Sequence, residues 1–278
     1  MNRLGALATA AMFGLISSGA AIAEGVAGKP VDAGHHFQRA VTPVMEDIIW
    51  LDDFMHVIMI AITLFVTALM GYCIFKFSRK NNPTPATFTH NTTIEVIWTA
   101  VPVLILIIIA IPSVQLLFKQ LDVPPADVTI KATGHKWYWS YEYPEEKIAF
   151  DAIMLEREEL AENGYQPDEY LLATDERVVV PVGAVVHVLV TASDVIHAWT
   201  IPSFGSKIDA MPGRINETWF QAMEEGVFFG QCSELCGLNH SYMPIVVEVV
   251  SQDEYDTWVL ETASRDVEPA TQVAAVSE

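Results

Sequence analysis

The sequence predicts a two-helix membrane hairpin joined to an all-β extramembrane domain. The hairpin is predicted by two apolar runs, Phe54–Phe75 and Ile94–Phe118, each longer than the roughly 20 residues that cross a bilayer. The β domain is predicted by a change of pattern near Leu121, after which short alternating segments are separated by Gly and Pro. The hydrophobic share of 51% is at the upper limit for a soluble protein and agrees with membrane segments.

The amino terminus is predicted to be a secretory signal peptide over residues 1–23. Arg3 provides a positive charge, Leu4–Ile16 is a moderately apolar stretch, and Ala21–Ala23 offers a small-x-small cleavage site. The alternative, an uncleaved membrane anchor, is weaker because the stretch is short and rich in Ala and Gly. Residues 24–53 are then a periplasmic N-terminal segment.

The hairpin is predicted to hold the β domain in the periplasm. The expected segments are helix 54–76, loop 77–93 and helix 94–118. Between the apolar runs lie Lys76, Arg79 and Lys80 with no acidic residue, and short basic loops stay on the cytoplasmic side. Pro102 and Pro112 lie inside the second run, where we expect a kink rather than an end of the helix.

The extramembrane domain is expected over residues 119–262. The predicted strands are 128–133, 137–143, 177–182, 184–191, 195–201, 217–223, 227–231 and 244–250. Many short strands with Gly and Pro between them indicate a sandwich or a barrel. Residues 155–170 are charged and predict a surface insertion with a helical turn or two, 253–260 predict a short closing helix, and 263–278 predict a disordered tail.

The net charge of −20 comes from 15 basic and 35 acidic residues, and the whole imbalance lies from Gln120 onward. A strongly acidic domain repels nucleic acid and attracts basic partners. The alternative is that the acidity only keeps the domain soluble. Charge alone therefore does not separate a docking surface from an ordinary solvated one.

A group of metal-ligand side chains lies near the carboxyl terminus. Cys232, Cys236, His240 and Met243 form a soft ligand set that favours copper, zinc or an iron–sulfur centre, and the thioether points to copper. A blue-copper site needs a second imidazole, which His197 could supply, but then one Cys is left over. Two thiolates could instead bridge two coppers, each with its own histidine.

Three other readings of the same residues stay open on local chemistry. Cys232 and Cys236 could form a disulfide in an oxidising compartment. A structural zinc could take both thiolates and two histidines, which would leave Met243 and Glu234 without a role. Met243 could also be an ordinary core residue.

The chain resembles subunit II of cytochrome c oxidase, from bacterial aa3-type haem–copper oxidases. The pattern C-x-E-x-C-x3-H-x2-M is similar to the binuclear CuA motif of that family. The resemblance extends from Asp47 to Leu260 and includes the aromatic run 134–143, the segment 194–199 and the segment 209–214. It implies a cupredoxin-like Greek-key sandwich on two transmembrane helices.

The resemblance implies six ligands for two copper ions, namely His197, Cys232, Glu234, Cys236, His240 and Met243. In the family the two cysteines bridge the coppers, the histidines are terminal ligands and the methionine is a weak ligand. The glutamate binds through its backbone carbonyl, and its carboxylate reaches a magnesium ion shared with subunit I. Quinol oxidase relatives share the fold and lack these ligands.

The implied function is electron input to an oxygen-reducing, proton-pumping complex of the bacterial inner membrane. Electrons would pass from cytochrome c to the copper pair and on to haem a in subunit I. Subunit I also holds haem a3 and CuB. Subunit III and membrane lipid are further expected partners. No C-x-x-C-H haem-attachment motif occurs, so the donor is a separate cytochrome c. A copper chaperone or store is the rival reading, and it would need neither paired helices nor the aromatic run. Nitrous oxide reductase, a second rival, has a much longer chain.

The aromatic run offers a point of electron input. Alternation places Trp137, Trp139, Tyr141 and Tyr143 on one face of a strand, where most are expected to be core residues. The resemblance singles out Trp137 as the surface residue that accepts the electron. It also implies four carboxylates for docking the basic ring of cytochrome c: Glu142, Asp151, Asp175 and Asp194.

Glu95 lies at the cytoplasmic end of the second apolar run, after Thr92 and Thr93. An ionisable residue in a membrane segment is a functional candidate, although a carboxylate here could simply cap the helix start. The resemblance favours the mouth of a proton pathway into subunit I. Cys73, in the first run, is predicted to be a small packing residue.

Overall fold

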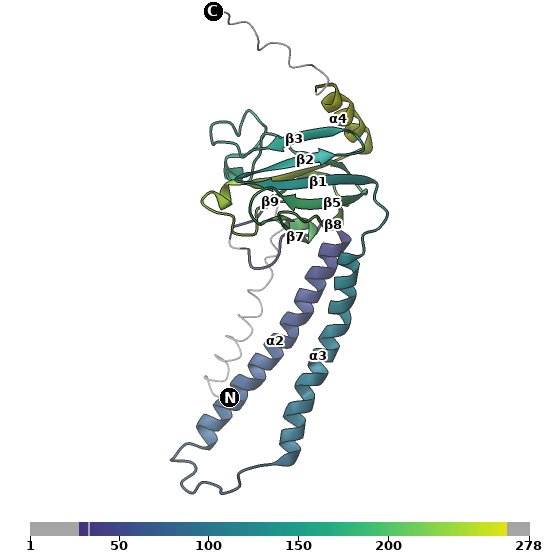
Figure 1. Cartoon of the computed structure of the whole chain (residues 1–278). Helices are drawn as coiled ribbons and strands as arrows, with labels where there is room; N and C mark the ends of the chain where they lie inside the picture. Colours follow the sequence, from purple (N-terminus) through teal and green to yellow (C-terminus); the bar gives the residue numbers. More distant parts are fainter. Residues whose placement is uncertain (1–27, 33, 266–278) are drawn as a thin grey trace, which may run out of the picture.

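The computed structural model describes residues 28–32 and 34–265. The predicted signal peptide and most of the predicted tail lie outside the described residues. Two long helices run side by side beneath a β domain, and a shorter helix lies at the far end of that domain (Figure 1).

Helix α2 spans Pro43–Lys76 and helix α3 spans Thr92–Leu121. Both are long and apolar enough to cross a membrane, with mean hydropathies of 2.4 and 2.7. Helix α2 begins well before the apolar run at Phe54, because Thr42 caps it: the Thr42 hydroxyl accepts a hydrogen bond from the backbone N–H of Met45 at 3.0 Å. Pro43 suits the first helical position.

The two helices are joined to each other and to the β domain near the predicted outer membrane surface. The Lys119 ammonium group pairs with the Asp47 carboxylate across the helices at 2.5 Å. The indole N–H of Trp219 donates to the backbone carbonyl of Lys119 at 3.2 Å. These contacts connect the start of α2, the end of α3 and the β domain.

The extramembrane domain contains ten strands and one α-helix, α4. The strands are β1 Val128–His135, β2 Tyr138–Tyr143, β3 Ile148–Ala152, β4 Val178–Pro181, β5 Val185–Ala192, β6 His197–Ile201, β7 Ser206–Ala210, β8 Asn216–Gln221, β9 Gly226–Gln231 and β10 Pro244–Val250. One sheet has the order β3-β2-β1-β5-β8, a second has β4-β10-β9, and β6 pairs with β7. The β1–β5 and β4–β10 pairs are parallel and the others antiparallel.

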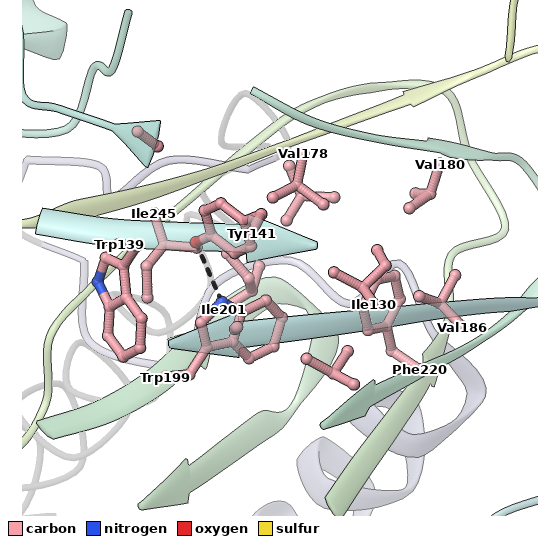
Figure 2. Packing of buried hydrophobic residues seen from close by; sticks show 14 of the residues in the cluster. Ile130, Trp139, Tyr141, Val178, Val180, Val186, Trp199, Ile201, Phe220 and Ile245 are labelled. Atoms are coloured by element: carbon pink, nitrogen blue, oxygen red, sulfur yellow. Dashed lines mark hydrogen bonds between the residues drawn. The ribbon is translucent and has the colours of Figure 1, made fainter. Parts of the chain in front are cut away.

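The core fills the space between the sheets. Figure 2 shows side chains from the five-stranded and three-stranded sheets directed into one interior: Ile130, Val186, Phe220, Val178, Val180 and Ile245. Trp139, Tyr141 and Tyr143 are fully buried, as the alternation predicted. The Tyr141 hydroxyl accepts a hydrogen bond from the Trp199 indole at 3.3 Å, so the buried polar atoms of these two rings satisfy each other.

The sequence did not predict strands β3 and β7. Strand β7 carries a single large apolar residue, Ile208, and is formed mainly by its backbone pairing with β6. Strand β2 begins at Tyr138, so Trp137 lies in the turn before the strand rather than in it.

The predicted insertion at 155–170 contains turns and the short 3-10 helix η1, Pro167–Glu169. Its apolar residues are buried rather than on the surface: Leu155, Leu160 and Tyr165 pack with Phe229 in a second cluster. Helix α4 spans Gln252–Arg265, so the first residues of the predicted disordered tail are helical.

The described residues between Gly28 and Thr42, here called the N-terminal strap, lie against the β domain. The backbone carbonyl of Gly28 accepts from the N–H of Phe229 at 2.8 Å, and Val41 bonds through its backbone with Ser203 and Met223. The Arg39 guanidinium forms two hydrogen bonds to the Glu224 carboxylate. These contacts hold the strap against the β domain at Gly28, at Arg39 and at Val41.

Candidate metal centre

The loop between strands β9 and β10 holds five of the six predicted copper ligands. These strands are antiparallel neighbours, with Gln231 opposite Pro244, so the loop from Cys232 to Met243 starts and ends at one place. The backbone N–H of Cys232 donates to the carbonyl of Met243 at 3.3 Å and closes the loop.

The sixth predicted ligand, His197, comes from the first position of strand β6. The backbone N–H of Ser233 donates to the carbonyl of Ala198 at 3.1 Å and holds this strand beside the loop. The side chain of His197 is fully buried. A ligand from a distant part of the sequence is thus brought to the two cysteines.

Each cysteine sulfur faces one imidazole. Cys232 Sγ lies 3.8 Å from His197 Nδ1, and Cys236 Sγ lies 3.5 Å from His240 Nδ1. The two sulfurs are 3.8 Å apart. A disulfide bond is about 2.05 Å long, so the cysteines are unbonded in this structure.

The remaining two predicted ligands each lie beside a different cysteine sulfur. The Met243 sulfur is 3.5 Å from Cys236 Sγ, and its side chain is buried. The backbone carbonyl oxygen of Glu234 is 3.3 Å from Cys232 Sγ, whereas Glu234 is an exposed residue. The structure therefore brings together all six donor groups that the sequence singled out.

The two thiols have different acidities. Burial raises the pKa of Cys232, but hydrogen bonds from His197 and from nearby backbone groups outweigh burial and lower this pKa to about 7. Burial, and then repulsion by the negative charge of Cys232, raise the pKa of Cys236 to about 12. The pair therefore favours a single thiolate near neutral pH until a cation offsets the second charge.

Asp194 orients His197 from behind. One Asp194 carboxylate oxygen accepts from His197 Nε2–H across 2.9 Å, while Nδ1, on the other side of the ring, faces Cys232. The other Asp194 oxygen accepts from the backbone N–H of Lys136 at 2.8 Å. The family resemblance assigned Asp194 to docking, and the contact between Asp194 and His197 was not predicted. The three-residue spacing between the two residues could have indicated it.

Trp137 lies against the backbone of the ligand loop at Cys236 and Gly237. Its side chain is half-buried, and its indole N–H donates to the backbone carbonyl of Cys236 at 3.3 Å. Gly237, at φ +120°, permits this approach, since a Cβ there would lie 3.2 Å from the ring. At Gly134, a Cβ would come within 2.9 Å of the His197 ring. Neither glycine was predicted from the sequence to be part of the site.

The other three predicted docking carboxylates lie on the domain surface and already accept hydrogen bonds. Glu142 pairs with Lys131 at 2.5 Å, and Asp151 accepts from the Ser140 hydroxyl at 2.5 Å. Asp175 accepts from the backbone N–H of Ile153 at 2.7 Å. Glu142 and Asp151 belong to the neighbouring strands β2 and β3.

Glu95 lies in the first turn of α3, far along the helix from the β domain (Figure 1). Its carboxylate accepts from the backbone N–H of Asn91 at 3.3 Å, while the Asn91 side chain accepts from the N–H of Ile94 at 3.2 Å. Glu95 therefore contributes to the helix cap, which was the alternative to its role in proton transfer. Cys73 is exposed on α2 among the residues that the structure describes.

Comparisons with known proteins match both parts of the chain. The family described as "Cytochrome C oxidase subunit II, transmembrane domain" matches residues 30–116, and "Cytochrome C oxidase subunit II, periplasmic domain" matches residues 128–250. Cytochrome c oxidase subunit 2 of Cereibacter sphaeroides is 48% identical over 264 residues, which cover 88% of this chain and 87% of the relative. The chain belongs to the cytochrome c oxidase subunit II family.

Two further proteins are similar to this chain. A probable cytochrome c oxidase subunit 2 of Rickettsia bellii is 48% identical over an alignment that covers 84% of this chain and 86% of the relative. The crystal structure of the periplasmic domain of subunit II of cytochrome oxidase from Bradyrhizobium japonicum is 51% identical, with a TM-score of 0.47, and covers 52% of this chain and 99% of that one. The family match over residues 128–250 and the 48% identity to the Cereibacter sphaeroides relative show that the β domain of this chain is the CuA-type periplasmic domain of the family.

The donor set fits copper better than the alternatives. Two thiols, two imidazoles and a thioether are ligands that copper accepts, and a structural zinc would leave the Met243 sulfur unused. Met243 is buried, but its sulfur is directed at Cys236 and not only into the core. Each cysteine sulfur lies near one imidazole and near the other sulfur, an arrangement that would suit two thiolates shared by two metal ions.

Proposed function

We propose that this chain is the electron-input subunit of a cytochrome c oxidase, which takes electrons from cytochrome c onto two copper ions and passes them to haem a in subunit I. One observation carries the proposal: two unbonded cysteine sulfurs, 3.8 Å apart, each face a separate histidine. A single copper would not use both thiolates in this way.

His197, Cys232, Glu234, Cys236, His240 and Met243 are the proposed ligands. Bound copper supplies a site that gains and loses one electron. The protein supplies a cage whose ligands are already in place, since Asp194 holds His197 and the β9–β10 pairing holds the loop. A ligand cage that does not rearrange favours fast transfer because little reorganisation accompanies the change of charge.

Trp137 is the proposed point of electron input. The half-buried indole is connected to Cys236 by one hydrogen bond, so it links the domain surface to a ligand backbone. Glu142, Asp151 and Asp175 are proposed to attract the basic donor from a distance. Asp194 is proposed to act mainly through His197 and the turn that carries Trp137.

The proposed partners follow from exposed groups around the centre. Leu235 and Leu238 are 77% and 88% exposed on the ligand loop, as expected where another protein packs. We assign this contact to subunit I, and propose that the exposed carboxylate of Glu234 holds a magnesium ion between the two subunits. Glu95 is proposed to lie at the mouth of a proton pathway into subunit I. Subunit III and membrane lipid are further proposed partners, and the assembled oxidase is proposed to lie in the bacterial inner membrane.

The proposed function is tested by loading the full chain with copper. We expect two coppers per chain and an EPR signal from one unpaired electron shared by both nuclei. Cys232→Ser should abolish the shared signal, because one thiolate cannot provide two bridges. Ser233→Ala, beside it on the loop, is the matched control. A ratio of one copper per chain, or a signal from a single nucleus, would contradict the proposal.

A further inference from the structure

A second group of metal-ligand side chains lies where the N-terminal strap meets helix α2. His36 from the strap and Asp52 and Asp53 from the helix each offer a ligand atom, and these atoms all lie within 4.8 Å of one another. His56, one turn further along α2, has its ring 6.3 Å from that of His36. None of these residues belongs to the copper centre described above.

The two segments that carry this group are held independently. On the strap, Arg39 is bound to Glu224 and Thr42 caps α2. On the helix, His56 Nδ1 lies 2.9 Å from the backbone carbonyl of Asp52 and 3.3 Å from its carboxylate. His56 therefore holds the Asp52 carboxylate, a ligand atom of which lies within 4.8 Å of one on His36.

The carboxylates of this group have no strong cationic partner. Among the described residues, no Lys or Arg forms an ion pair with Asp52 or Asp53, and the single ion pair there is the one between His56 and Asp52. Two adjacent carboxylates at the point where the apolar run begins leave a local excess of negative charge. A cation would neutralise it.

We propose that His36, Asp52 and Asp53 bind a divalent transition-metal ion of the zinc type, with His56 positioning Asp52. Imidazole nitrogen with carboxylate oxygen is a ligand set that zinc accepts, whereas calcium and magnesium prefer oxygen alone. Bonds of about 2.0–2.2 Å in a tetrahedral site place ligand atoms roughly 3.5 Å apart. The partly or fully exposed side chains reach that spacing by small rotations, and the ion would join the strap to the membrane helix.

The test measures zinc binding to the full chain with its copper centre already loaded, so that the cysteines cannot take the added ion. Equilibrium dialysis against Zn²⁺ in excess Mg²⁺ gives the stoichiometry for wild type, His36→Ala, Asp53→Asn and His35→Ala. His35 is the matched control because it is the adjacent histidine and is absent from the group. The copper absorption band shows that each variant is folded.

We expect His36→Ala and Asp53→Asn each to weaken one zinc site by at least about tenfold, and His35→Ala to leave it unchanged. Zinc should also raise the unfolding temperature of wild type and of His35→Ala more than that of the other two variants. Equal zinc binding by all four proteins would overturn the proposal, as would a loss in His35→Ala that matched the loss in His36→Ala.

Discussion

The indole N–H of Trp137 donates a hydrogen bond to the backbone carbonyl oxygen of Cys236, across 3.3 Å. The two residues are far apart in the sequence, and the contact places an aromatic ring against the backbone of a proposed copper ligand. Asp194 supports the arrangement from the other side, because it binds both His197 and the backbone of Lys136 next to Trp137.

Replacing Trp137 should separate electron transfer from docking. We expect Trp137→Ala to slow transfer within the bound complex by about 10- to 100-fold, since a misplacement of about 1 Å can cost that much. The salt dependence of association should stay near that of wild type, because no charge is changed. Stopped-flow reduction of the copper centre by cytochrome c measures both quantities. Trp137→Phe keeps a ring but loses the hydrogen bond, and should have an intermediate rate.

The surface carboxylates should affect association instead. Glu142→Gln, Asp151→Asn and Asp175→Asn are expected to lower the association rate with cytochrome c and to flatten its salt dependence. The effect should shrink as the Debye length falls below about 10 Å. Asp253→Asn, a surface acid on α4, is the control. Slower transfer at saturating cytochrome c in these variants would contradict a docking role.

Asp194 should differ from the other three carboxylates. Because it orients His197, Asp194→Asn is expected to change the optical and EPR spectra of the copper centre as well as the association rate. The measurement compares the optical and EPR spectra of the copper-loaded full chain carrying Asp194→Asn with those of the chain carrying Asp151→Asn. Identical spectra for the two variants would return Asp194 to a purely surface role.

Glu95 can be tested against its helix-capping contact. Glu95→Ala should slow turnover of the assembled oxidase and leave reduction of the copper centre unchanged. Glu95→Gln keeps an oxygen that can accept the hydrogen bond from Asn91 but cannot carry a proton. If the carboxylate serves proton uptake, oxygen consumption should fall in both variants. Normal turnover in Glu95→Gln would assign the residue to the cap.

The N-terminal strap should loosen in acid. The hydrogen bond from Arg39 holds the pKa of Glu224 below its usual range. A group whose pKa is lowered by folding stabilises the folded state above its unfolded pKa, and this contribution is lost as the pH falls through the folded value. The protection factors of the strap amides, which compare each measured exchange rate with the intrinsic rate at the same pH, should therefore fall below about pH 4.5, the usual range of a glutamate. Arg39→Ala should show faster exchange already at neutral pH and a weaker dependence on acid.

The sequence by itself determined the membrane hairpin and most of the ligand loop. Long apolar runs have few folded alternatives in water, so their length already predicts a membrane span. Cys232, Cys236, His240 and Met243 are close in the chain, and their shared chemistry could be recognised without a fold. The buried face of β2 was likewise predictable, because alternation in a strand is a local property.

The tertiary structure decided which distant residues complete the site. Backbone hydrogen bonds between β6 and the ligand loop bring His197 to the cysteines, and the turn before β2 places Trp137 on Cys236. The same holds for Asp194 behind His197, and for His36 beside Asp52 at the strap. Sequence patterns report local periodicity and local chemistry, whereas these contacts arise from pairing between segments that are far apart along the chain.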